Sequence, residues 1–359
     1  MWAEAEGRNY RRTILGDTLV RALMAAFVAH LSGLREIAQR MGDRLGTSNF
    51  SSLSHAIGRA STLTYLKAIV EQIQVAHKPR PGELVPLDSM AVTLPITQRH
   101  RCKKFNRSTA GGGVLWEYRI NAAPGTCPVR ILHTMAGAWN DSTLMKGVSL
   151  LAHGPIYLMD RGFFSLPLIE EWCTKGVRFI VRARFNLVYE NVCNVSRARA
   201  YGKQGRIELD AIVRLGCTHT KCHPIARLIR VKIGRQHISL LTEEITWSAV
   251  QILEAYKKRE RIERFHRFVK ENIGLAHLYN FSHTGIMVLL YSALLVALLL
   301  FLAESPEPTH EDETIIALRK GFNAVRAAMG LGHPWKRNTN THKRSPDVRK
   351  FKWQELQNP

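Results

Sequence analysis

The spacing of hydrophobic positions changes near residue 80. Before that point apolar residues recur at helical intervals, for example over residues 34–41 and, after a serine that can cap a helix, over residues 51–59. Two short successive helices are typical of a helix-turn-helix module, whose second helix enters the major groove of DNA; a helical packing or dimerisation domain has the same spacing. We therefore expect a helical N-terminal domain over residues 1–80, with DNA-end binding as one of two interpretations.

A segment rich in Pro and Gly, residues 77–82, indicates a domain boundary. The pattern beyond it predicts strands at 84–94, 115–122, 129–136, 155–159 and 177–182, a turn at 111–113, and helices at 142–151 and 166–173. Three strands followed by alternating helices and strands predict an α/β fold: a mixed sheet flanked by helices.

The α/β alternation is interrupted between residues 185 and 245. This part of the chain has strand patterns at 206–215, 225–233 and 237–241, and we interpret it as a β-rich insertion. The α/β core would then comprise residues 81–184 and 246–303. A long basic helix is expected from 248 to about 274, and the C-terminal part, 304–359, contains a helix at about 311–329 and a basic tail.

Residues 285–303 carry no charge and are about long enough to cross a membrane. A helix that is apolar on all sides can also lie in the centre of a large soluble domain. We expect the buried helix and no stable membrane association, because this is the one such stretch in a chain that is otherwise strongly basic. A basic protein anchored in a membrane by this helix is the alternative.

The charge balance narrows the choice of partner. Lys and Arg number 51 and Asp and Glu 29, which leaves a net charge of +22 and a pI of about 10.1. Such a surface attracts polyanions, and nucleic acid is the commonest one for a soluble chain. The six cysteines have no framework spacing and no signal sequence opens the chain, so we expect a cytoplasmic, nucleoid-associated protein.

Two aspartates occur in apolar segments that are predicted to be buried strands. Asp88 lies within the strand at 84–94, and Asp160 lies at the carboxyl end of the strand at 155–159, where α/β sheets collect active-site groups. A buried carboxylate needs a partner, and a divalent cation is one of the few that offset its desolvation. Each could instead be a helix cap or a salt-bridged core residue, and we interpret Asp141, between them, as a cap.

A third candidate group lies on the basic helix. At about 100° per residue, Tyr256, Arg259, Glu263 and Lys270 share one helical face. This face presents one carboxylate, which can bind a metal, among cations that can bind phosphate. The simpler alternative is a solvated surface helix in which Arg259 and Glu263 form an i,i+4 ion pair.

The three groups together resemble a known family. Tyr256-x2-Arg259-x3-Glu263-x6-Lys270 is similar to the Y-R-E-K signature of DDE transposases of the bacterial insertion-sequence-four type. The segment 160–163, Asp-Arg-Gly-Phe, resembles the second acidic motif of that family, and the strand that carries Asp88 resembles the first. The resemblance covers roughly residues 84–303, including the insertion before the last acid.

The resemblance implies a ribonuclease-H-like core in which Asp88, Asp160 and Glu263 are the catalytic residues and hold two Mg²⁺ or Mn²⁺ ions. It implies that Tyr256, Arg259 and Lys270, and less directly Arg161, bind DNA phosphates. The function would be strand cleavage and strand transfer at the ends of an insertion sequence. The partners would be the inverted-repeat ends of the element and target DNA, with a dimer on DNA.

The sequence departs from the family pattern after the signature arginine. Many members of that family have Trp at this position, whereas this chain has Glu260. Whether the reaction uses a hairpin intermediate therefore stays open. Two rival functions also stay open. One is a catalytically inactive or repurposed sequence-specific DNA-binding protein, which would keep the basic surface without the chemistry. The other is a nuclease of the same fold that cuts without joining.

Overall fold

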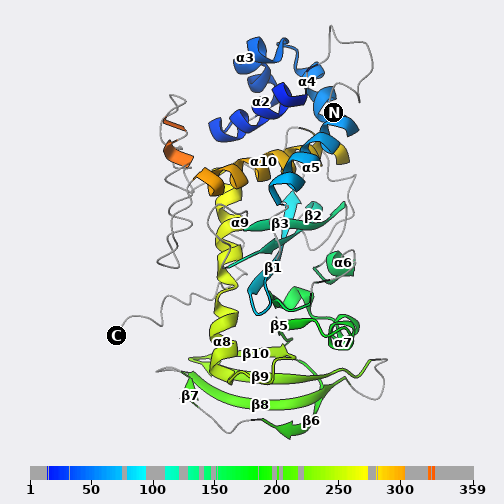
Figure 1. Cartoon of the computed structure of the whole chain (residues 1–359), viewed down its shortest axis with the longest axis vertical. Coiled ribbons are helices and arrows are strands. Elements are labelled where there is room, and N and C mark those ends of the chain that lie inside the picture. Colours follow the sequence, from blue (N-terminus) through cyan, green and yellow to red (C-terminus); the bar gives the residue numbers. More distant parts are fainter. Residues whose placement is uncertain are drawn as a thin grey trace.

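The structure is a computed structural model (Figure 1). It describes residues 16–31, 33–74, 79–93, 110–120, 128–136, 141–146, 153–184, 186–195, 205–216, 222–273 and 282–303, and a few isolated positions besides. The N-terminal part is helical, as expected. Its helices are α2 (Gly16–Ala29), α3 (Leu34–Leu45), α4 (Phe50–Ile57) and α5 (Ala60–Gln74).

The helices α3 and α4 correspond to the two predicted at 34–41 and 51–59. Helix α3 ends at Gly46, whose φ of 66° is left-handed and suits a residue without a Cβ. The cap of α4 is Asn49 and not the predicted serine, because the Asn49 side chain accepts a 2.9 Å hydrogen bond from the Ser51 amide.

One mixed sheet organises the rest of the described chain. Its path is β3-β2-β1-β4-β5-β10-β9-β8-β6, and β7 pairs with β8. Strands β1, β2 and β3 are antiparallel neighbours, whereas β4 and β5 run parallel to β1. The strands are β1 (Leu84–Thr93), β2 (Ala110–Tyr118), β3 (Val129–Ala136), β4 (Ile156–Met159), β5 (Arg178–Arg182), β6 (Tyr189–Asn194), β7 (Ala200–Tyr201), β8 (Gly205–Leu215), β9 (Ile225–Ile233) and β10 (Gln236–Thr242).

The strands predicted within 185–245 continue this sheet. Strand β10 pairs antiparallel with β5, for example Leu241 with Val181, and β9, β8 and β6 follow outward. Arg227, which is 1% exposed, binds Asp210 at 2.7 Å and donates to backbone carbonyls that include that of Trp247. This buried guanidinium fixes the path of the chain from the last strand into the next helix.

Two local predictions were wrong. Residues 111–113, expected as a turn, lie within β2, where Gly112 and Gly113 pair with β1 on one side and β3 on the other. Pairing on both edges holds these glycines extended in spite of their conformational freedom. The helix expected at 142–151 is shorter, since α6 spans Asp141–Lys146. Helix α7 (Leu166–Thr174) and the short 3-10 helix η3 (Arg161–Phe163) complete this region.

The long basic helix expected from residue 248 is two helices. Helix α8 (Ala249–Lys257) opens with a capping box formed by Ser248 and Gln251, and α9 (Glu260–Asn272) follows it end to end (Figure 1). At the junction the Arg259 amide bonds to the Tyr256 carbonyl at 3.0 Å. This i→i+3 bond tightens one turn, and Arg259 keeps right-handed φ and ψ angles of −58° and −26°.

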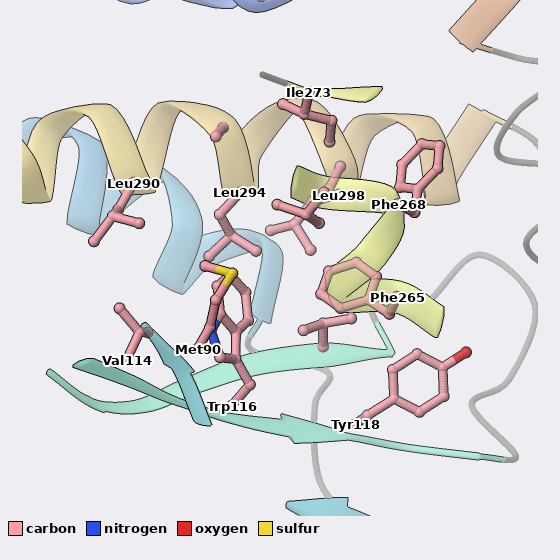
Figure 2. Close-up of a cluster of buried hydrophobic side chains, with 14 of the residues drawn as sticks. Met90, Val114, Trp116, Tyr118, Phe265, Phe268, Ile273, Leu290, Leu294 and Leu298 are labelled. Carbon is pink, nitrogen blue, oxygen red and sulfur yellow. The ribbon is translucent and has the colours of Figure 1, made fainter. Parts of the chain in front are cut away.

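The apolar stretch forms α10 (His283–Ala303), a core helix. The window His283–Leu300 is long and apolar enough to cross a membrane, but 78% of it is buried inside the protein. Helices α2 and α5 cover one side of α10, and Leu290, Leu294 and Leu298 face the sheet (Figure 2). The prediction of a buried helix is therefore confirmed in this fold. Of the helix predicted at 311–329, residues 322–324 and 326–327 are described and helical; the other predicted positions lie outside the described residues.

Candidate active site

The register of the sheet brings the first two predicted acids together. Strands β1 and β4 are parallel neighbours, and Leu87 pairs with Met159. Asp88 and Asp160 are the next residues on the two strands, so they occupy adjacent positions about 4.8 Å apart in the direction of pairing. Strand β5 extends the row, because Val181 pairs with Met159 and Arg182 follows it. Two carboxylates and a cation thus form a row across three neighbouring strands in the middle of the sheet.

Asp88 is held by both of its oxygens. Oδ1 accepts a 2.9 Å hydrogen bond from the Ser89 amide, and Oδ2 lies 3.3 Å from Nδ1 of His266 on α9. Burial acts to raise the pKa of Asp88, but the hydrogen bond and charge of His266 and the charge of Arg259 outweigh it and lower that pKa below the ordinary value. Asp88 is therefore an ionised carboxylate at neutral pH.

Asp160 has a second, local function. Its Oδ1 accepts a 2.6 Å hydrogen bond from the Arg161 amide and so caps η3. The alternative that Asp160 is a helix cap is thus confirmed. The Arg161 side chain is exposed beside it.

Glu263, the third predicted acid, lies on the first turn of α9 and is 44% exposed. It forms an ion pair with Arg259, whose side chain is 12% exposed. Desolvation acts to lower the pKa of Arg259, yet the combined effect of Tyr256, Asp160, Glu263 and Asp88 raises it. The Arg259 guanidinium therefore lies within electrostatic reach of all three predicted acids.

Tyr256 and Lys270 lie at the same site. The ring of Tyr256 is 5.9 Å from the Arg259 guanidinium carbon, and its buried hydroxyl has no hydrogen-bond partner among the described residues. Burial raises the pKa of Tyr256, so the phenol is protonated at neutral pH. Partial burial of the Lys270 ammonium group lowers its pKa, and the charge of Asp88 opposes this shift, so the two groups interact.

Two residues at this site were not among the predicted site residues. One is His266, seven residues after Arg259 and therefore on the same helical face, a signal that the sequence contained. The other is Asp141, interpreted as a cap. The Ser89 hydroxyl donates to its Oδ1, and burial together with the charges of Asp88 and Asp160 raises its pKa. The sequence gives no sign of this contact, since 52 residues separate Ser89 from Asp141.

Aromatic packing fixes the helix that carries Glu263. Phe265 packs against Trp116 and Tyr118 of β2, at ring-centroid distances of 5.7 and 6.1 Å, and Phe268 lies next to one end of α10 (Figure 2). Trp116 and Phe265 are fully buried. Because these rings interdigitate, α9 has little freedom to slide along the sheet.

The donor set suits a hard divalent cation. It consists of carboxylates, the ligands that Mg²⁺ and Mn²⁺ prefer, and their mutual repulsion favours a bound cation. Within the part of the chain that is described, no three Asp, Glu, His or Cys side chains are arranged as a metal site. Arg259, which pairs with Glu263, is the cation that lies among the acids in this structure.

Part of the chain is similar in sequence to transposases. Residues 123–299 match the family model described as the transposase DDE domain. A probable transposase for the insertion sequence element IS5377 of Geobacillus stearothermophilus is 23% identical over 148 residues, which are 40% of this chain and 38% of that protein. The chain thus spans well under half the length of this relative. The matched family segment contains Asp141, Asp160 and Glu263, and it begins after Asp88.

Proposed function

We propose that this protein is a DDE transposase that performs metal-dependent cleavage and strand transfer of DNA at the ends of an insertion sequence. The similarity to a transposase DDE domain supports this function. The observation that carries the proposal is the adjacency of Asp88 and Asp160 on neighbouring parallel strands, next to the helix on which Arg259 pairs with Glu263.

In this function Asp88, Asp160 and Glu263 hold two Mg²⁺ or Mn²⁺ ions. When bound, such a pair of ions activates the attacking oxygen and stabilises the leaving oxygen of a phosphoryl displacement. The strand order β3-β2-β1-β4-β5, with β4 and β5 parallel to β1, supports a ribonuclease-H-like core around them. Asp88 and Asp160 are adjacent on rigid strands, while Glu263 is on a helix surface and partly exposed.

The cations of the Y-R-E-K pattern would bind the DNA backbone. Arg259 presents a planar fork that matches two phosphate oxygens, and it can exchange Glu263 for phosphate when a metal takes the carboxylate. The protonated hydroxyl of Tyr256, which lies beside Arg259, would donate to the same phosphate. Lys270, Arg161 and the net charge of +22 extend the basic surface.

The assembly follows from the same proposal. The helical domain 1–80 would bind the inverted-repeat ends through α3 and α4, residues 81–184 and 246–303 would form the catalytic core, 185–245 the insertion, and 304–359 a C-terminal extension. The burial of α10 supports the prediction that this helix belongs to the core and is not a membrane anchor. Two such chains would act on the two ends of the element in the bacterial cytoplasm.

The test is Mg²⁺-dependent nicking of a duplex that carries the ends of the element. The intact chain is compared with Asp160→Ala and Glu263→Ala, and with Glu171→Ala, an exposed carboxylate on α7 that pairs with Lys175. We expect the intact chain and Glu171→Ala to cut at the element boundary, while the two site variants bind the duplex without cutting. If all four bind and none cuts, a DNA-binding protein without activity is the better interpretation. A separate assay for joined products distinguishes a transposase from a nuclease.

A further inference from the structure

Asp141 connects the two segments that carry the first two acids. It is the first residue of α6, and its Oδ1 accepts a hydrogen bond from the hydroxyl of Ser89, the residue after Asp88 on β1. Ser89 therefore presents its backbone amide to Asp88 and its side chain to Asp141. The carboxylate of Asp141 thus holds β1 at the residue next to Asp88.

The other oxygen of Asp141 lies against η3. A Cβ placed on Gly162 would overlap Oδ2 of Asp141, so the carboxylate is in close contact with the backbone two residues after Asp160. Gly162 does not have the positive φ angle that favours glycine elsewhere in this chain. The absence of a side chain is needed at this position for the approach of Asp141, and not for the backbone conformation.

We propose that Asp141 is a positioning residue that sets the spacing between Asp88 and Asp160, through Ser89 on one side and Gly162 on the other. This inference rests on the proposed function, since it concerns the same site. It gives a role to a residue outside the three predicted acids. It also gives a physical reason for the glycine in the Asp-Arg-Gly-Phe segment, which the resemblance alone leaves unexplained.

The contacts of Asp141 favour positioning over direct metal binding. One oxygen is occupied by the Ser89 hydroxyl and the other faces the Gly162 backbone. An asparagine keeps both the shape and the oxygen that accepts from Ser89, whereas an alanine loses both. Metal binding, in contrast, requires the charge, which asparagine lacks. The two roles therefore predict different results for Asp141→Asn.

The experiment measures Mn²⁺ binding by calorimetry and nicking of the end duplex, with kcat and KM determined separately. The full-length chain is compared with Asp141→Asn, Asp141→Ala, Ser89→Ala and Gly162→Ala. For Asp141→Ala we expect Mn²⁺ affinity and kcat to fall about 10- to 100-fold, the size of effect seen when a residue that orients a metal ligand is lost, with KM for DNA unchanged. Asp141→Asn should keep both the Mn²⁺ affinity and kcat within a few fold of the values of the intact chain.

The other variants extend the test and keep it decisive. Gly162→Ala should reproduce the loss seen in Asp141→Ala, and Ser89→Ala, which removes one hydroxyl, should show a smaller loss of the same kind. If Asp141→Ala does not fold, as judged by circular dichroism, the comparison of Ser89→Ala with the intact chain takes its place.

Three results would overturn the inference. An Asp141→Asn variant as impaired as Asp141→Ala in Mn²⁺ binding would make the charge, and hence direct ligation, the important property. If the intact chain is active and Asp141→Ala, or Ser89→Ala in its place, has the same Mn²⁺ affinity and kcat, Asp141 has no positioning role. The proposed function would still stand. An intact chain that neither binds Mn²⁺ nor cuts would overturn the proposed function itself.

Discussion

His266 Nδ1 lies 3.3 Å from Asp88 Oδ2, so α9 and β1 are joined by a contact between two side chains at the candidate site. His266 is 5% exposed and its ring lies against that of Trp116, with centroids 5.8 Å apart. The helix that carries Glu263 is thus held to the strand that carries Asp88 by a polar contact inside an aromatic cluster. The separation of the first and third acids depends on this contact.

Replacement of His266 by phenylalanine should destabilise the protein by about 1–3 kcal/mol, because Asp88 keeps its burial and loses its partner. The Asp88→Asn and His266→Phe double variant should recover part of this loss, since it no longer leaves a partly buried charge without a partner. Urea unfolding of the two single variants, the double variant and the intact chain, near neutral pH without metal, gives the free energies. A double variant no more stable than His266→Phe would contradict the proposed contact.

The lowered pKa of Asp88 predicts a pH dependence of stability. Burial alone would raise this pKa, but His266 and Arg259 lower it in the folded protein. A carboxyl group with a depressed folded pKa stabilises the fold above its unfolded pKa, and this contribution is lost as the pH falls through the folded value. The difference in unfolding free energy between the intact chain and Asp88→Asn should therefore be largest near neutral pH and shrink below about pH 4.

The measurement is the same denaturant titration repeated from neutral to acid pH in a chelating buffer. Glu171→Ala, an exposed carboxylate in an i,i+4 pair with Lys175, is the matched control and should change little over this range. A difference for Asp88→Asn that grows as the pH falls would have the wrong sign and would contradict the lowered pKa.

Regular patterns in the sequence predicted much of the fold. Strand β3 spans the predicted residues, Val129–Ala136, because β-branched and apolar residues bounded by turn residues specify a strand locally. The position of Asp160 at the end of a buried strand was predictable for the same reason. The general mixed α/β arrangement followed from the order of the elements.

Contacts between distant segments were not predictable in this way. The approach of Asp141 to Ser89 and Gly162 depends on how α6 lies on the sheet, and one sequence carries no record of that. The junction at Lys258 and Arg259 was missed because both residues favour helix and keep right-handed helical backbone angles there, so the local sequence carries no sign of the division. Residues 111–113 were misread because glycine suggests a turn unless neighbouring strands hold it.

Helix α10 offers a direct test of its buried position. Leu294 is fully buried and Leu299 is 41% exposed on the same helix. If α10 is a core helix, Leu299→Lys should remain soluble and folded, whereas Leu294→Lys should unfold the protein, because a buried lysine without a partner is costly. In a helix that faces lipid, a lysine at either position would be unfavourable.

The measurement is the soluble yield and thermal unfolding of the two variants and the intact chain, together with fractionation after a high-salt wash. The high-salt wash should release the intact chain from the particulate fraction, because salt screens the binding of basic residues to phosphates. Salt does not release a helix that spans the membrane. Retention of the intact chain in the membrane fraction after the wash would contradict the core-helix assignment.

Replacement of Arg259 by lysine separates charge from geometry at the candidate site. Lysine keeps the positive charge among the three acids, but it has no planar fork to bind two oxygens at once. If Arg259 exchanges Glu263 for the phosphate next to the scissile bond, Arg259→Lys should bind the end duplex almost normally and cut it about 10- to 100-fold more slowly, a loss of about 1.4–2.7 kcal/mol of transition-state stabilisation. Single-turnover nicking and a gel-shift titration measure the two properties.

The matched control is Arg264→Lys, on the same helix, where the arginine contacts Glu260 at 3.3 Å in a surface i,i+4 pair. This exchange should leave cleavage unchanged, because such a pair is worth little and lies outside the candidate site. Equal cleavage by Arg259→Lys and the intact chain would show that charge alone is needed. Equal losses of cleavage in the two variants would point to an effect on the stability of α9 and would remove Arg259 from its proposed contact with DNA.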